Sequence, residues 1–182
     1  MREIATMTRH NMPTLGVLAL LLSSGLSSAA FAQGTETMRT LPNGDVVTND
    51  RSVSNGTYQD QRSVTTPAGG SYNNDRTVGN GEYTDTRTAT NAKGATYSNT
   101  RTYGNGQYTD TRSASGANGA SYANTRNIAN GQYSDNRSVT RANGATYDSS
   151  RTASNGTWNH AWSGETAGGH SFSGSRSGSY HR

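Results

Sequence analysis

A tyrosine followed at the fourth position by an arginine recurs through the chain, at intervals that alternate between 14 and 11 positions. One long and one short interval together make up the true period of 25, so the unit is a double repeat. Repeats of this length predict units that stack on their neighbours and do not surround one core. The pairs are Tyr58/Arg62, Tyr72/Arg76, Tyr83/Arg87, Tyr97/Arg101, Tyr108/Arg112, Tyr122/Arg126, Tyr133/Arg137 and Tyr147/Arg151, followed by the altered copies Trp158/Trp162 and Phe172/Arg176.

Two kinds of turn alternate between these units. The shorter link contains Asn-Gly, the preferred two-residue hairpin turn, as at Asn105-Gly106. The longer link contains three residues ending in glycine, as at Ala117-Asn118-Gly119, which fits a type I turn closed by a left-handed glycine. The segments between turns alternate with period two and are rich in β-formers. The sequence therefore predicts an all-β fold, a repetitive antiparallel meander of about twelve short strands.

The turn positions predict which residues face each other. A turn at Asn105-Gly106 sets Arg101 opposite Asp110, and a turn at Ala117-Asn118-Gly119 sets Asp110 opposite Arg126. A second row alternates arginine with asparagine, so we expect each arginine to meet an acceptor on both neighbouring strands. The first row is a structural ladder of alternating charge: Arg51, Asp60, Arg76, Asp85, Arg101, Asp110, Arg126, Asp135 and Arg151, continued by His160 and Arg176.

The sign of these charges favours the meander over a β-solenoid with one double repeat per coil. A solenoid would stack arginine on arginine and aspartate on aspartate, whereas the meander pairs opposite charges directly across the ladder. The solenoid stays open as the alternative, because asparagine and tyrosine also stack well on themselves.

The segment 1–32 differs from the rest of the chain. Arg2 and Arg9 precede the apolar run 15–22, and Ala30-Phe31-Ala32 is a small-x-small cleavage signal, so we expect a secretory signal peptide over 1–32 that is cleaved near Ala32. We expect a short linker over 33–38 and the β-repeat domain over 39–182, with an atypical terminal repeat over 158–182. The spacing from Arg39 to Arg51 is one longer than the short interval of the repeat, which predicts a one-residue bulge.

The composition argues against several classes of function. Without cysteine there are no disulfides. The apolar run 15–22 of the signal peptide is too short to span a bilayer, and we expect no transmembrane span in the mature chain. The mature part has 14 Lys+Arg and 11 Asp+Glu, a net charge of +3, and each ladder aspartate offsets a nearby arginine, so we do not expect nucleic acid as a partner. The aspartates already have arginine partners and the histidines do not converge. We therefore predict no catalytic residue, no metal site and no cofactor, and a protein that is not an enzyme.

A sheet with two polar faces is weakly stable alone, and its edge strands invite another chain. The sequence thus favours a secreted structural protein that self-associates as a surface fibre, or as a matrix or adhesion component, outside the cell or at its surface, with the periplasm as the alternative location. In its signal peptide, short β repeats and richness in Asn, Gly, Ser, Thr and Tyr, it is similar to secreted bacterial proteins that build surface fibres, such as curli-like subunits, although no curli-type motif of regular Gln and Asn is present.

Two alternative functions use the surfaces of the predicted sheet. Exposed aromatic rows suit stacking on a polysaccharide or on a cell surface, although cross-strand packing is the other role such rows play. The opposite face carries rows of threonine such as Thr77, Thr84, Thr102 and Thr109, a regular hydroxyl array that suits ice binding. The candidate aromatic binding surface comprises Tyr58, Tyr83, Tyr103, Tyr108, Tyr133, Trp158 and Trp162.

Overall fold

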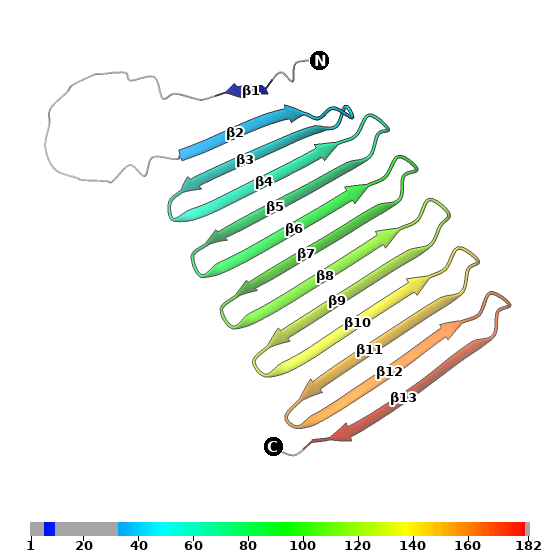
Figure 1. Cartoon of the computed structure of the whole chain (residues 1–182). Helices are drawn as coiled ribbons and strands as arrows, with labels where there is room; N and C mark the ends of the chain where they lie inside the picture. The colour runs from blue at the N-terminus through cyan, green and yellow to red at the C-terminus, as the bar shows by residue number, and fades with distance from the viewer. Residues whose placement is uncertain (1–5, 10–32, 181–182) are drawn as a thin grey trace, which may run out of the picture.

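The structure is a computed structural model that describes residues 6–9 and 33–180. These residues form one open antiparallel sheet of 13 strands, in which spatial order follows chain order from β1 to β13 (Figure 1). The meander predicted from the sequence is therefore confirmed. The strands are β1 (Thr6–Arg9), β2 (Gln33–Thr40), β3 (Val46–Ser54), β4 (Thr57–Thr65), β5 (Ser71–Gly79), β6 (Glu82–Thr90), β7 (Thr96–Gly104), β8 (Gln107–Ser115), β9 (Ser121–Ala129), β10 (Gln132–Thr140), β11 (Thr146–Ser154), β12 (Thr157–Glu165) and β13 (Ser171–Ser179).

The two kinds of turn lie at opposite ends of the strands (Figure 1). In each Asn-Gly turn both residues have positive φ, for example 50° at Asn105 and 72° at Gly106, as a type I′ turn requires. In the longer turns the Gly94 N–H donates to the Asn91 carbonyl at 3.0 Å, and Gly94 has φ of 81°. The type I turn closed by a left-handed glycine is thus also confirmed.

These turns produce the predicted register. Arg101 faces Asp110, Asp110 faces Arg126, and arginine alternates with aspartate along the ladder from Arg51 on β3 to Arg151 on β11. His160 on β12 and Arg176 on β13 continue the row. We call the sheet face that carries this row the ladder face, and the opposite face, with its rows of threonine and serine, the threonine face.

The N-terminal part of the sheet differs in two ways from what we expected from the sequence. Residues 33–38, expected as a linker, lie in β2. The expected bulge is wrong, because Pro42-Asn43-Gly44 forms the same three-residue turn as the later repeats, closed by the Leu41 N–H donating to the Asp45 carbonyl at 2.8 Å. Arg39 therefore faces Val47, and Thr35 takes the ladder position opposite Arg51.

The predicted signal peptide lies outside the described residues except for Thr6–Arg9, which form β1 against β2. Among the described residues, no helix is long and apolar enough to span a membrane.

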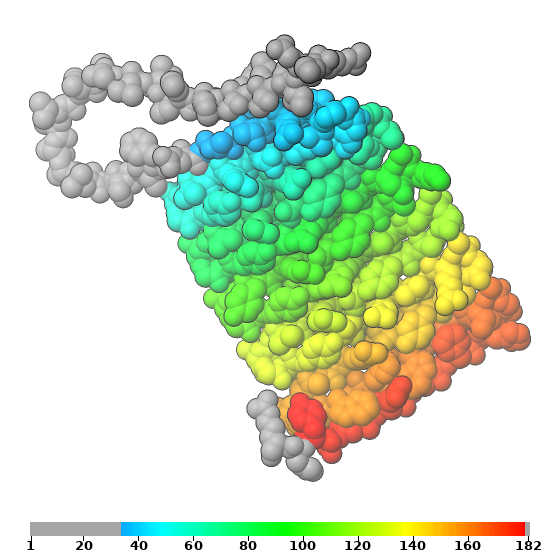
Figure 2. Space-filling view, in the orientation of Figure 1, coloured from blue at the N-terminus to red at the C-terminus, as the bar shows by residue number. Residues whose placement is uncertain are grey.

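The sheet has no apolar core. No hydrophobic side chain among those described is buried, and the buried side chains are polar or charged: Asp85, Asn99, Asp110, Asn124 and Asp135. The molecule is a slab one sheet thick, with successive strands forming successive bands of its surface (Figure 2). Among the described residues, burial is therefore confined to three aspartates of the ladder and two asparagines of the neighbouring row.

Candidate functional site

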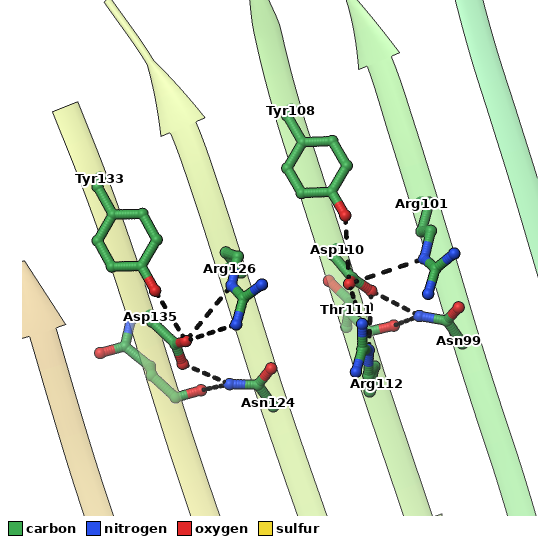
Figure 3. Close-up of polar contacts among 11 residues, drawn as sticks. Asn99, Arg101, Tyr108, Asp110, Thr111, Arg112, Asn124, Arg126, Tyr133 and Asp135 are labelled. Carbon is green, nitrogen blue, oxygen red and sulfur yellow. Dashed lines mark hydrogen bonds and ion pairs between the residues drawn. The ribbon is translucent and has the colours of Figure 1, made fainter. Parts of the chain in front are cut away.

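The most ordered feature of the ladder face is a set of buried carboxylates, each surrounded by donors. Asp110 on β8 is 1% exposed and lies between β7 and β9. Its Oδ2 accepts from Arg112 Nη2 at 2.6 Å and from the Tyr108 hydroxyl at 3.3 Å, and Arg101 Nε lies 3.7 Å away (Figure 3). Three strand positions on one face thus converge on one carboxylate.

Asparagine supplies a further hydrogen bond to the buried carboxylate. Asn99, on the neighbouring strand β7, donates from Nδ2 to Asp110 Oδ1 at 2.6 Å and to the Thr111 carbonyl at 3.3 Å (Figure 3). Asn99 faces Arg112 in the register, yet it reaches diagonally to the aspartate. The expectation that asparagine would serve as an acceptor for arginine is therefore wrong: asparagine is a further donor to the aspartate.

The same arrangement recurs around Asp135 and, in part, around Asp85. Asp135 accepts from Asn124 at 2.6 Å, from the Tyr133 hydroxyl at 3.0 Å and from Arg126 Nη2 at 3.2 Å (Figure 3). Asp85 accepts from Asn74 at 2.5 Å and from Arg87 at 2.7 Å. The unit that repeats is thus an aspartate held by asparagine, arginine and, in two copies, tyrosine.

These contacts keep the carboxylates of Asp110 and Asp135 ionised. Burial raises the pKa of Asp110, but hydrogen bonds from Arg112 and Asn99 and the charges of Arg112 and Arg101 outweigh it, so the pKa lies below its ordinary value. For Asp135, burial likewise raises the pKa, and the hydrogen bonds from Asn124, Tyr133 and Arg126 bring it below the ordinary value. A carboxylate held ionised between arginines is a structural anchor, and it is poorly suited to act as a general base near neutral pH.

The terminal copy replaces nearly every member of this unit. His160 occupies the aspartate position, with Ser149, Trp158 and Trp162 where the other copies have asparagine, tyrosine and arginine. Ser149 Oγ lies 3.2 Å from His160 Nε2, and the His160 and Trp162 rings are 5.1 Å apart. Desolvation and the positive charges of Arg151 and Arg176 lower the pKa of His160, so its imidazole is neutral at pH 7.

Glycines make room for the aromatic rings of this copy. Gly174 faces Trp162 and Gly178 faces Trp158 across the β12–β13 pair, and a Cβ at Gly178 would lie 2.7 Å from Trp158 Nε1. Arg176, between these glycines, places its guanidinium carbon 5.3 Å from the Trp162 ring, a cation–π contact. The two indoles therefore lie against the last strand and pack on it.

The structure brings most of the predicted aromatic surface together. Trp162 is the exception and lies on a different row, opposite Ser149. Tyr108 and Tyr133 turn their hydroxyls to the aspartates, whereas Tyr103 is 60% exposed and offers an open ring. The six residues that share one outer row of the ladder face are Tyr58, Tyr83, Tyr103, Tyr108, Tyr133 and Trp158, interrupted by Val78, Ile128 and Ala153.

On the opposite side of the sheet, threonines pair with one another as the register predicts. Thr84 faces both Thr77 and Thr102, and the Thr86 and Thr100 hydroxyls lie 3.3 Å apart. Toward the C-terminal end, the threonine face contains a depression of about 750 Å³ lined by small side chains such as Ala123, Ser150 and Ala161.

The two faces carry opposite charge, a separation that was not predicted from the sequence. Over β2–β13 the ladder face holds eleven arginines against four aspartates, a net charge of +7, and the threonine face holds six carboxylates and neither lysine nor arginine. Charge counted along the chain hides this separation, and assigning each residue to a face would have revealed it. The arginines are Arg39, Arg51, Arg62, Arg76, Arg87, Arg101, Arg112, Arg126, Arg137, Arg151 and Arg176, and the carboxylates of the threonine face are Glu36, Asp50, Asp75, Glu82, Asp148 and Glu165.

No group of three or more histidine, aspartate or glutamate side chains in residues 33–180 is placed to hold a metal ion. Comparison with protein-family models, curated proteins and solved structures gives no match.

Proposed function

We propose that this protein is a non-enzymatic structural component, exported from the cell, that self-associates through its β-sheet into a fibre or a matrix. The observation that carries the proposal is the open sheet without a single buried hydrophobic side chain among the described residues. A lone sheet of this kind has little apolar burial to offset the ordering of its backbone. Further copies of the chain would supply the missing burial.

The outer strand supports the same proposal. β13 is nine residues long, contains no proline and has one charged residue, Arg176. Its outer side pairs with no strand in the described part of the chain, so a row of backbone donors and acceptors is open to another chain. Edges of natural sheets that stay monomeric are commonly shortened, charged or covered.

Light scattering and electron microscopy of the purified protein over a range of concentrations test the assembly. We expect concentration-dependent growth into filaments or layers, with fibre diffraction spacings of about 4.7–4.8 Å and about 10 Å. A monomer that persists at every concentration would refute self-association. Cell fractionation with N-terminal sequencing tests export separately, and we expect the extracellular or surface-bound chain to begin near Gln33.

A second candidate function is polysaccharide binding, which the exposed Tyr103 ring favours. Tyr103 is flanked directly by Tyr83 and Tyr108 across the sheet, so three rings lie side by side. Flat rings in a row suit the faces of sugars. In a glycan pull-down we expect Tyr103→Ala to reduce binding, and binding that is unchanged by Tyr103→Ala would count against this candidate.

A further inference from the structure

The unpaired charges on the two faces are also unevenly distributed along the sheet. Six ladder-face arginines have no carboxylate within 4 Å among the described residues, and they lie toward the two ends of the sheet, on β2, β4 and β5 and on β10, β11 and β13. The arginines on β7, β8 and β9 are paired with Asp110 and Asp135. The six are Arg39, Arg62, Arg76, Arg137, Arg151 and Arg176.

The carboxylates of the threonine face follow the same distribution. Four lie on β2, β3, β5 and β6 and two on β11 and β12, and all six are exposed. On β7–β10 the threonine face is neutral. The six are Glu36, Asp50, Asp75 and Glu82 at one end and Asp148 and Glu165 at the other, and none lies within 4 Å of a basic nitrogen among the described residues.

We propose that copies of this chain stack face to face, with the ladder face of one copy on the threonine face of the next. This inference rests on the proposed self-association and names the surfaces that carry it. Sheets pack face to face about 10 Å apart. At that spacing, unpaired arginines at each end of one sheet reach carboxylates at the corresponding end of the next.

The sizes of the side chains on the two faces also favour contact between a ladder face and a threonine face. The ladder face projects long side chains, including Tyr103 at 60% exposure, whereas the threonine face presents mainly threonine, serine, alanine and glycine. The depression of about 750 Å³ on the threonine face, floored in part by Ala123 and Ala161, offers room for such side chains. The two faces thus complement each other in shape as well as in sign.

The geometry also selects the polarity of the stack. Two ladder faces in contact would oppose two surfaces of net +7, and two threonine faces would oppose two surfaces that bear only negative charge. Only the contact between unlike faces is attractive. Such a contact is heterologous, leaves a free face at each end, and therefore continues into an open stack. A polyanion on the ladder face would leave the carboxylates of the threonine face unexplained, so a second copy is the better occupant.

The test uses full-length protein and two variants of equal charge. In the first, Asp50→Asn, Asp75→Asn and Asp148→Asn remove three charges from the threonine face. In the second, Ala92→Lys, Ala117→Lys and Ala142→Lys add three charges in exposed turns, which gives the same change of +3. Association is followed by sedimentation velocity between 0.05 and 1 M NaCl, and circular dichroism checks that each variant keeps its sheet.

We expect the threonine-face variant to need about tenfold higher concentration for half-maximal association at low salt, and the turn variant to stay within about threefold of the natural protein. Raising the salt to 1 M, where the Debye length is about 3 Å, should weaken association of the natural protein by a similar factor. A variant with Arg62→Gln, Arg137→Gln and Arg151→Gln should lose association as the threonine-face variant does. Mixed together, these two defective variants should form a dimer that grows no further, because each retains one intact face.

Four other results would each overturn a stated part of this proposal. Association that salt and both neutralised variants leave unchanged would overturn face-to-face stacking and leave edge-to-edge self-association standing. Failure of the mixed variants to dimerise would overturn the stated polarity of the stack. Association that requires an added sulfated polysaccharide would overturn the inference in favour of a polyanion. A natural protein that never associates would overturn the proposed function together with this inference.

Discussion

At the scale of single residues, the aspartate is the organising group of this chain. Burying a carboxylate is unfavourable unless charge-assisted hydrogen bonds compensate for lost water. Asp110 is 1% exposed and receives such bonds from Arg112, with further donors from Asn99 and Tyr108. Its environment is complete only when β7 and β8 are in register, because Asn99 and Arg101 lie on β7 and Tyr108 and Arg112 on β8, so the aspartate ties the pairing of these strands to a favourable electrostatic contact.

Reversing the charge of one such aspartate should destabilise the sheet more than adding the same charge on the other face. Asp110→Arg places an arginine between Arg101 and Arg126 and removes the carboxylate that Arg112 and Arg101 contact. We expect a loss of about 3–5 kcal/mol in the free energy of unfolding, as for a broken buried pair. Thr109→Arg, one residue away on the threonine face, should cost about 0.5 kcal/mol. Urea unfolding measures both, and equal losses would refute the contribution of the ladder.

The depressed pKa values of Asp110 and Asp135 predict a loss of stability in acid. A carboxyl group whose pKa is lower in the folded state stabilises the fold above its unfolded pKa of about 3.9, and this contribution disappears as pH falls through the folded value. The free energy of unfolding should therefore fall below about pH 4. Asp110→Asn should be less stable than the natural protein at pH 7 and should show a smaller further fall between pH 4 and pH 2.

Side-chain contacts were only partly predictable from the sequence. Turn lengths placed Asp110 opposite Arg101 and Arg126, because backbone pairing follows directly from where the turns lie. The diagonal reach of Asn99 depends on its side-chain conformation, which pairing does not determine. The contact between Tyr108 and Asp110 could have been predicted from the sequence, since residues two apart on a strand share a face.

At the scale of elements, the turns determine the sheet. The two turn types keep the same residues on one face throughout, so local turn chemistry was enough to predict the whole register. The expected bulge failed because the arginine spacing was measured from Arg39, which is not the repeat arginine. Pro42-Asn43-Gly44 matches the three-residue turns of the later repeats, and this match gives the correct register without a bulge.

A bulky residue in a type I′ turn tests this role. Gly106 has φ of 72° with open space around its Cα, so a side chain there is opposed by backbone conformation alone. We expect Gly106→Val to lower the free energy of unfolding by about 1–2 kcal/mol. Gln107→Val, at the neighbouring exposed strand position, should be neutral or slightly stabilising because valine favours strands. Comparable losses from both variants in urea unfolding would contradict this role of the turn.

The last hairpin depends on glycine where earlier strands carry side chains. A methyl group at Gly174 would meet the Trp162 indole, so Gly174→Ala should displace that ring and destabilise the β12–β13 pair by about 1–3 kcal/mol. Tryptophan fluorescence reports this directly, because Trp158 and Trp162 are the two tryptophans of the chain. Gly168→Ala in the turn, whose methyl would make ordinary contact at 3.7 Å, is the control. An emission spectrum unchanged by Gly174→Ala would show that the indole does not rest on the glycine.

At the scale of the whole molecule, the sheet is a one-dimensional array. Every contact between strands joins neighbours in sequence, and no apolar core links distant repeats among the described strands. Stability in such an array is the sum of the strands and their interfaces with their neighbours. Separation of charge between the faces is a property of the array as well, because it emerges only when all strands share one register.

The array predicts that losing a complete repeat is tolerated better than losing one residue. Deleting the segment 107–131 removes one complete double repeat, joins Gly106 to Gln132, and sets Arg101 opposite Asp135 with the ladder intact. Deleting Thr109 alone moves Tyr108 to the opposite face relative to Asp110, because side chains alternate along a strand. We expect the long deletion to keep its β-sheet circular dichroism and cooperative urea unfolding. The single deletion should lower the urea midpoint further, and the reverse order of midpoints would mean that the repeats do not act as separate units.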